Sequence, residues 1–224
     1  MTVAAVVAAA GRGNRLGAAV PKALVAVAGV PLVVHAVRTM RAAGADVVIV
    51  TAQPDFLDDV AALVPDARVI AGGVLRQDSV ALALRELPDE VDVVLVHDAA
   101  RGLAPVALAA AVIATVRAGA DAVVPVLPVA DTVKEVDVDG NVVTTVDRAH
   151  LRAVQTPQGF RRTVLQRAHD EATGVEVTDD AAMVEALGLV VTTIPGALLA
   201  MKVTTGADLA IAESLLAASV DRVG

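Results

Sequence analysis

Short apolar runs alternate along this chain with longer stretches in which apolar residues recur at helical spacing. The runs have the length of β-strands, and the stretches between them are long enough to form helices. Strands that are apolar throughout are typical of parallel sheets that helices cover on both faces. The pattern therefore predicts an α/β fold with a mainly parallel sheet and helices on both of its faces. The expected strands are Val3–Ala9, Asp46–Thr51, Ala67–Ala71, Val91–His97 and Ala122–Val126.

Helices are expected between these strands. The first has a proline in its first turn and a glycine, Gly44, beyond its end, which is the usual order of these residues in a helix. The expected helices are Pro31–Ala43, Asp55–Leu63, Ser79–Leu87 and Val106–Ala118. Ligands of such sheets bind at the carboxyl ends of the strands, so the loops that follow the strands are the places to look for functional residues.

Residues 130–150 break this alternation. Polar and apolar residues alternate on both sides of Asp139-Gly140-Asn141, which predicts a β-hairpin. A hairpin inserted between core elements has little core of its own and is only marginally stable alone. We therefore expect residues 130–150 to form an arm that packs against the same arm of a second subunit. The rest of residues 1–224 is expected to be a single domain.

The last third of the chain continues the alternation with shorter elements. Thr178-Asp179-Asp180 is expected to cap one of its helices. The expected elements are a short strand over Ala153–Phe160, a helix over Arg161–Ala172, a helix over Ala181–Leu187, a strand over Leu189–Ile194, a short strand over Ala200–Val203 and a closing helix over Ala207–Ala218.

The loop after the first predicted strand has the composition of a phosphate-binding loop. Small residues there would let backbone N–H groups approach a phosphate, and the cationic side chains would neutralise its charge. A P-loop is excluded because alanine follows Gly17, and the third glycine falls one residue late for a dinucleotide fingerprint. The second strand also ends without the acidic residue that would hold a ribose. The segment consists of Ala8–Ala10, Gly11–Gly17 and Pro21-Lys22.

Two further loops follow predicted strands. Residues 72–79 contain paired glycines, Arg76 and Ser79, which could hydrogen-bond a base, a ribose or a phosphate. An ordinary turn with Ser79 as a helix N-cap explains them equally well. Asp98 ends a buried strand, where a carboxylate is costly unless it is paired or binds a cation. It could hold Mg²⁺ against a triphosphate, or form a structural ion pair with Arg101.

Composition and charge narrow the possible functions. The formal net charge of −8 argues against a nucleic-acid-binding protein, and two phenylalanines are too few for stacking on single strands. The chain has no cysteine, so thiol catalysis and cysteine-ligated zinc are excluded. We see no membrane-spanning run and no signal peptide, and we expect a cytoplasmic protein with no membrane partner. Lysine occurs only at Lys22, Lys134 and Lys202, which suggests positions where a compact charge matters.

The histidines have no pair with the spacing of metal ligands. His35 and His169 lie within predicted helices, and we expect them to be packing or surface residues. His97 neighbours Asp98 and is expected to orient the loop rather than to transfer a proton.

Eight segments together resemble the 2-C-methyl-D-erythritol 4-phosphate cytidylyltransferase family. Any one of these segments alone is weak evidence for the family, but eight of them in the same order over nearly the whole chain are specific evidence. They are residues 9–17 with Pro21-Lys22, Gly72-Gly73 with Arg76 and Asp78-Ser79-Val80, His97–Arg101, Asp131–Lys134, Val146–Arg148, Gln155–Phe160, Thr178-Asp179 and Lys202–Thr204.

The resemblance implies a Rossmann-like fold of the nucleotide-diphospho-sugar transferase type and a homodimer built around the arm. It implies transfer of a cytidylyl group from CTP to methylerythritol phosphate, with release of pyrophosphate, in the non-mevalonate route to isoprenoids. Mg²⁺ is the cofactor that the resemblance implies. In such transfers positioning and cationic clamping dominate, because the acceptor phosphate is already anionic.

The resemblance also implies roles for individual residues. Arg15 and Lys22 would stabilise the transition state at the α-phosphate, and Asp98 would hold Mg²⁺. Lys202 and Arg148, the latter from the arm of the second subunit, would position methylerythritol phosphate. Secondary contacts are expected from Arg101, Thr132 and Thr156. The CTP site would be shaped by Ala9, Ala10, Gly11, Gly13, Gly73, Arg76, Ser79 and Ala99.

The chain departs from the family pattern in two places. Many members have an acidic metal contact shortly before the lysine, and Gly196–Lys202 contains none, so we name no second metal ligand. Gly102 stands where a proline often follows the arginine, and we expect it to change only the stiffness of the loop.

Two other functions remain open from the sequence. A cytidylyltransferase for another polyol phosphate, such as ribitol 5-phosphate, shares most of these motifs, although Asp131–Lys134 and Val146–Arg148 favour methylerythritol phosphate. A non-catalytic nucleotide-binding regulator on the same fold is the second alternative. Such a regulator would not need the acceptor-side cations Arg148 and Lys202.

Overall fold

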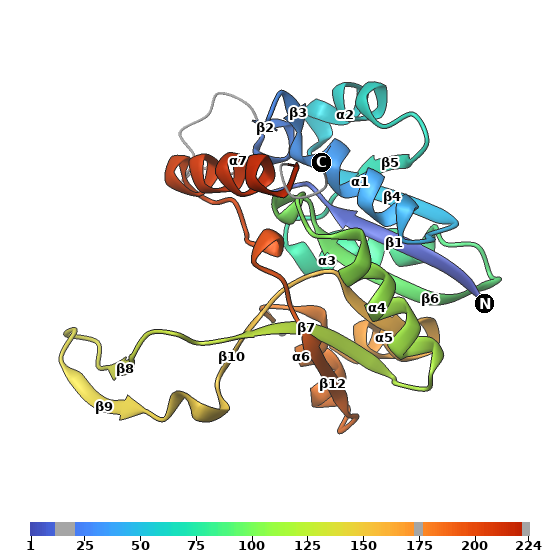
Figure 1. Ribbon diagram of the computed structural model, residues 1–224. Helices are drawn as coiled ribbons and strands as arrows, with labels where there is room; N and C mark the ends of the chain where they lie inside the picture. Colours follow the sequence, from blue (N-terminus) through green and yellow to red (C-terminus); the bar gives the residue numbers. More distant parts are fainter. Residues whose placement is uncertain (12–20, 173–176, 221–224) are drawn as a thin grey trace.

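The core of the protein is one mixed β-sheet with helices on both faces (Figure 1), seen in a computed structural model that describes residues 1–11, 21–172 and 177–220. The strand order is β10-β7-β11-β6-β1-β4-β5, and β12 also pairs with β7. The strands are β1 (Thr2–Ala8), β4 (Val47–Ala52), β5 (Arg68–Ala71), β6 (Val91–Asp98), β7 (Ala122–Pro128), β10 (Arg152–Val154), β11 (Gln158–Arg161) and β12 (Val191–Pro195).

The parallel strands occupy the positions that the sequence predicts. β1 pairs in parallel with β4 and β6, β4 with β5, and β7 with β12. β11 is antiparallel to both of its neighbours, β6 and β7, and β10 is antiparallel to β7. The mainly parallel α/β fold is thus confirmed, while the antiparallel insertion between β6 and β7 was not predicted.

The side chains of β1 explain why this run is apolar throughout. Val3, Ala5 and Val7 pack in one hydrophobic core with α1, α2 and α4. Ala4 and Val6 face the opposite side and pack in a second core with α3, α5 and α6. The helices are α1 (Leu32–Ala42), α2 (Leu57–Leu63), α3 (Arg76–Arg85), α4 (Val106–Arg117), α5 (Arg162–Glu171), α6 (Asp180–Ala186) and α7 (Gly206–Val220). In the part of the chain that the structure describes, no helix is both long and apolar enough to cross a membrane.

Two predicted strands need correction. The single strand expected over Ala153–Phe160 is two strands, β10 and β11. The segment around Pro157 leaves the ladder between them, because proline has no N–H to donate. The strand expected over Ala200–Val203 is absent: η6 (Leu198–Ala200) is a 3-10 turn, followed by non-regular chain. There the backbone N–H of Val203 donates to Ala100 O at 2.8 Å, which ties the segment to the loop after β6.

Helix α3 begins at Arg76, earlier than the expected start at Ser79. The Asp78 carboxylate accepts the N–H of Leu75 at 3.0 Å and so closes the first turn. Ser79 therefore lies inside the first turns and is not the N-cap.

The predicted hairpin is confirmed and forms the arm, residues 130–150. β8 (Val133–Val136) and β9 (Val142–Val146) pair with each other in a sheet of their own and project away from the central sheet (Figure 1). In the turn, the Asp137 carboxylate accepts the N–H groups of Asp139 and Asn141. The arm ends at a 3-10 turn, η5 (Arg148–His150).

Several short elements in the first half of the chain were not predicted. They are η2 (Lys22–Leu24), β2 (Ala26–Val27), β3 (Val30–Pro31), η3 (Pro54–Phe56) and η4 (Ala99–Arg101). The β2–β3 hairpin and α7 share a small core that includes Val27, Leu32, Val203 and Ala212. Helix α7 thereby anchors the segment that carries Lys202.

Gly102 does more than set loop stiffness. A Cβ at this position would lie 2.7 Å from Leu32 O and 3.2 Å from the Cβ of His35. The glycine therefore lets the loop after β6 approach the start of α1 closely, which a proline would not do in this arrangement.

Candidate active site

A cavity of about 260 Å³ opens at the carboxyl ends of β1 and β6. This is the edge of the sheet where the sequence predicts ligand binding. Its described lining combines small residues with two lysines, one arginine and one aspartate. The lining residues are Ala8, Ala9, Ala10, Gly11, Lys22, Ala23, Gly73, Val74, Leu75, Arg76, Ser79, Asp98, Ala99, Ala100 and Lys202.

Most of the predicted site residues meet in this cavity. Those among its lining residues are Ala9, Ala10, Gly11, Lys22, Gly73, Arg76, Ser79, Asp98, Ala99 and Lys202. Arg15 and Gly13 lie outside the described residues. Thr132 and Arg148 are exposed residues at the two ends of the arm. Arg101 and Thr156 lie next to the lining and support it from behind.

The glycines of the 72–79 loop are required by close packing. A Cβ on Gly72 would lie 2.5 Å from the Ala10 Cβ, and one on Gly73 would lie 2.3 Å from the Asp78 Cβ. The Ser79 hydroxyl accepts the N–H of Gly73 at 3.0 Å and donates to Leu75 O at 3.2 Å. Ser79 thus fixes the glycine turn against the start of α3.

Asp98 is paired with Arg76 and Lys202, and not with Arg101, the structural partner that the sequence offered as an alternative to Mg²⁺. Arg76 Nε lies 2.9 Å from Asp98 Oδ1, and Lys202 Nζ lies 2.8 Å from Oδ2. Burial alone would raise the pKa of the Asp98 carboxyl, but Arg76 and Lys202 outweigh it and hold that pKa well below its usual range. Asp98 is therefore ionised at neutral pH.

Arg101 connects backbone segments. Its Nη1 donates to Ala200 O at 2.8 Å, and its Nη2 donates to Val154 O at 3.2 Å. The guanidinium thus holds the turn before Lys202 against the end of β10. Arg101 fixes the geometry of the cavity from outside it.

Thr156 and His97 support Asp98 from beneath. The Thr156 hydroxyl accepts the N–H of Asp98 at 3.0 Å and lies at hydrogen-bond distance, 3.0 Å, from His97 Nδ1. Complete burial lowers the pKa of His97 to about 4, against the opposing effect of the Asp98 carboxylate. His97 is therefore neutral at pH 7.

The low pKa of His97 predicts a loss of stability in acid. Between its ordinary pKa of 6.5 and about 4, the unfolded chain binds a proton that folded His97 does not. The free energy of unfolding should therefore fall as the pH drops through this range, by up to about 3 kcal/mol from this residue. We expect urea denaturation without magnesium to give a flatter pH dependence for His97→Asn, whose amide can still hydrogen-bond Thr156. An equal slope for the variant and the original chain would contradict the prediction.

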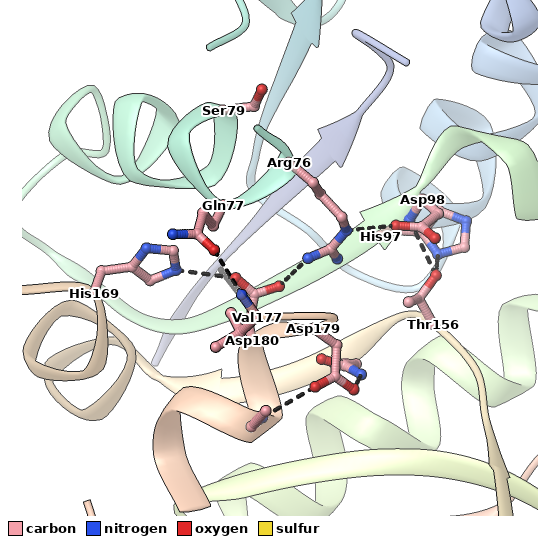
Figure 2. Close-up of polar contacts among 12 residues, drawn as sticks. Arg76, Gln77, Ser79, His97, Asp98, Thr156, His169, Val177, Asp179 and Asp180 are labelled. Carbon is pink, nitrogen blue, oxygen red and sulfur yellow. Dashed lines mark hydrogen bonds and ion pairs between the residues drawn. The ribbon is translucent and has the colours of Figure 1, made fainter. Parts of the chain in front are cut away.

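A buried ion pair extends the site away from the cavity (Figure 2). Arg76 Nη1 lies 2.6 Å from Asp180 Oδ2, and His169 Nε2 lies 2.9 Å from Asp180 Oδ1. Asp180 is completely buried, and its sequence position suggested only a part in a helix cap. The cap itself is confirmed at Asp179, which accepts the N–H of Ala182 at 3.0 Å. Two adjacent acids where a cap needs one were the signal that Asp180 has another partner.

The lining residues fit a divalent cation that is shared with a substrate. Asp98 is ionised and is the one carboxylate among the described lining residues. Within residues 1–11, 21–172 and 177–220, no cluster of three or more acidic or histidine side chains could hold a metal by itself. A Mg²⁺ ion at Asp98 would thus depend on phosphate oxygens and water for its other ligands, as is usual for this ion.

The chain is similar to proteins of known name over almost its full length. Residues 3–218 match the family model of 2-C-methyl-D-erythritol 4-phosphate cytidylyltransferase (IspD). The protein of that name from Frankia casuarinae is 57% identical over 217 residues, covering 96% of this chain and 81% of the relative. The one from Saccharopolyspora erythraea is 53% identical over 226 residues, covering 97% and 100%.

Solved structures give the same result. The crystal structure of 2-C-methyl-D-erythritol 4-phosphate cytidylyltransferase from Thermus thermophilus has a TM-score of 0.80 at 36% identity, covering 96% of this chain and 98% of that one. That of 4-diphosphocytidyl-2C-methyl-D-erythritol synthase from Anaerococcus prevotii has a TM-score of 0.83 at 26% identity, with the same coverage.

Proposed function

This chain belongs to the 2-C-methyl-D-erythritol 4-phosphate cytidylyltransferase family, and we propose that the cavity at the ends of β1 and β6 is its active site. The reaction transfers a cytidylyl group from CTP to 2-C-methyl-D-erythritol 4-phosphate in isoprenoid biosynthesis. It yields 4-diphosphocytidyl-2-C-methyl-D-erythritol and pyrophosphate. Membership of this family favours methylerythritol phosphate over ribitol 5-phosphate as the acceptor.

The active site is assigned to this cavity because several cationic side chains surround it. Lys22, Arg76 and Lys202 come from three distant parts of the chain and line the same space. Two anionic substrates must be brought together there, and negative charge on the α-phosphate must be stabilised as pyrophosphate leaves. Small residues at the end of β1 leave room for backbone N–H groups near the phosphates.

The cations are expected to have different roles. Lys22 and Arg15 would stabilise charge at the α-phosphate, and Lys202 would hold the acceptor phosphate. Lys202 is about half exposed, with 43% of its side chain accessible, so its ammonium can leave Asp98 for a substrate oxygen. Asp98 would hold Mg²⁺, and the ion, when bound, would neutralise phosphate charge.

Pyrophosphate release tests this function directly. The four nucleoside triphosphates are offered with methylerythritol phosphate and with ribitol 5-phosphate, with magnesium and after chelation. We expect release with CTP, methylerythritol phosphate and magnesium together. Release with ribitol 5-phosphate instead would overturn the acceptor, and CTP binding without release from any pair would indicate a regulator.

A homodimer built through the arm, residues 130–150, is a further part of the proposal. Val136 and Val142 lie opposite each other in the β8–β9 ladder, and 54% and 60% of these residues are exposed. Such apolar exposure on a projecting hairpin is typical of a surface that another chain covers. Arg148 lies at the base of the arm and would reach the acceptor site of the second subunit. A cytoplasmic location also stays a prediction from the sequence.

A charge placed on the arm is expected to separate the subunits. Val142→Asp should give a monomer in sedimentation analysis, because an aspartate would be buried without a partner in the interface. Its activity should fall together with dimer content, since Arg148 would no longer reach the second subunit's site. Val190→Asp is the control, because Val190 is also an exposed valine, 75% accessible, outside the arm. A Val142→Asp protein that remains dimeric would rule out this interface.

A further inference from the structure

Five charged or titratable side chains form a continuous chain of contacts from the cavity into the protein. Lys202 and Arg76 each contact Asp98. Figure 2 shows that the other end of the Arg76 guanidinium contacts Asp180, which His169 also contacts. Lys202, Arg76 and Asp98 line the cavity. Asp180 lies beneath it, at the start of α6, and has no exposed surface.

The Arg76 guanidinium is bound by two carboxylates, those of Asp180 and Asp98. Burial opposes the charged form of Arg76, but Asp180 and Asp98 together raise its pKa above the ordinary value. Arg76 Nη1 is committed to Asp180 and Nε to Asp98. Its third nitrogen, Nη2, is buried and has no hydrogen-bond partner among the described residues. The guanidinium is therefore fixed in place by its two contacts with Asp180 and Asp98.

We propose that Asp180 is a positioning residue for cytidylyl transfer, which acts by holding the Arg76 guanidinium in a fixed orientation between the two carboxylates. This inference rests on the proposed placement of the active site. Without the Asp180 charge, Asp98 is the remaining anionic partner of Arg76 among the described residues, and the guanidinium can turn fully toward Asp98 or toward a substrate phosphate. Either movement disturbs the arrangement at the reacting phosphate, because catalysis needs groups held within a fraction of an ångström.

The charge balance predicts a specific kinetic signature. Asp180→Asn removes one negative charge from beneath the cavity, so the attraction for the anionic CTP is not weakened. We expect kcat to fall by about tenfold, within the range of coupling in one ion-pair network, while KM for CTP and calorimetric CTP binding change by less than about threefold. General damage to the fold would instead weaken CTP binding and lower kcat together.

A double-mutant cycle decides whether Asp180 acts through Arg76. The variants are Asp180→Asn, Arg76→Gln and the two combined, measured against the original chain with CTP and methylerythritol phosphate. If Asp180 acts through Arg76, the double variant should have the kcat of Arg76→Gln alone, within about twofold. The double variant removes both charges of the pair, so it can be measured even if Asp180→Asn alone does not fold, and a kcat well below that of Arg76→Gln would then contradict the inference.

Asp179→Asn is the matched control. Asp179 is the neighbouring acid, and its oxygens accept hydrogen bonds from Ala182 and Gln158, without contact to Arg76. An asparagine keeps an oxygen for the helix cap, so kcat should remain within about twofold of the original.

Two results would overturn the inference: a kcat for Asp180→Asn equal to that of the original chain, or effects of Asp180→Asn and Arg76→Gln that multiply in the double variant. An original chain that binds CTP but releases no pyrophosphate would count against the proposed function. The inference on Asp180 is decided by the variants of an active protein, so the two failures can be told apart.

Discussion

Replacing Lys22 with alanine is expected to lower kcat by about 10²–10³-fold, the usual effect of removing one group that stabilises transition-state charge. Lys22 is the first residue of η2 and lines the cavity together with residues of the 72–79 loop. Its ammonium is one of three cations among the described lining residues. None of the other described lining residues can supply the missing charge without moving, so the loss should appear mainly in kcat and less in KM for the acceptor.

The fold of this variant should be intact. Lys22 is a partly exposed residue in a 3-10 turn, and the turn is closed by backbone hydrogen bonds, from Leu24 N to Pro21 O at 2.9 Å and from Val25 N to Lys22 O at 3.1 Å. The melting temperature should therefore remain near that of the original. Arg68→Ala removes a cation at the opposite, amino end of the parallel strands and should leave kcat unchanged. Near-normal turnover by Lys22→Ala would remove Lys22 from the mechanism.

The sequence predicts those parts of the fold that depend on local pattern. The continuous apolar run at the N-terminus predicts a strand covered on both faces, and Val3 and Ala4 indeed point into opposite cores. The Asp139-Gly140-Asn141 sequence predicts the hairpin of the arm, because the preference of these residues for a tight turn depends only on the local sequence. The loops at the carboxyl ends of β1, β5 and β6 then follow from the geometry of parallel sheets.

Parts that depend on distant contacts could not be read from the sequence. The sequence indicated that Asp98 either binds Mg²⁺ or forms an ion pair, and the arginine it offered for such a pair was Arg101. The partners are Arg76 and Lys202, which are 22 and 104 residues away and are brought to Asp98 by the fold. Likewise His169 has the spacing of a packing residue in a helix, and only the tertiary arrangement places it against Asp180.

The strand predicted over Ala200–Val203 is absent from the structure for a related reason. Its residues suit an extended conformation, but within the described part of the chain they join no strand ladder. Val203 instead donates its N–H to Ala100 O, and Arg101 holds Ala200 O, so the segment is fixed to the loop after β6. This attachment places Lys202 beside Asp98, which matters more for the site than regular secondary structure.

Asp98→Asn is the second variant with a large expected effect, on both activity and stability. An asparagine keeps one oxygen but has no charge, so the partly buried Arg76 would lose one of its two anionic partners among the described residues. We expect the free energy of unfolding to fall by about 2 kcal/mol, less than the full cost of breaking a buried pair, because Arg76 keeps Asp180. Lys202 contributes little to this loss, since its side chain is 43% exposed and can be solvated.

The activity of Asp98→Asn should fall further than its stability explains. With the carboxylate gone, the described lining has no anionic ligand for Mg²⁺, and Lys202 loses the partner that holds its ammonium beside the cavity. We expect kcat to fall by about 10²–10³-fold and the activity that remains to need more magnesium. Asp121→Asn, which breaks only the surface pair with Arg161, should change neither quantity appreciably. A variant that loses stability yet keeps its magnesium dependence would show that Asp98 is a structural anion, and the metal would then have to bind to the substrates alone.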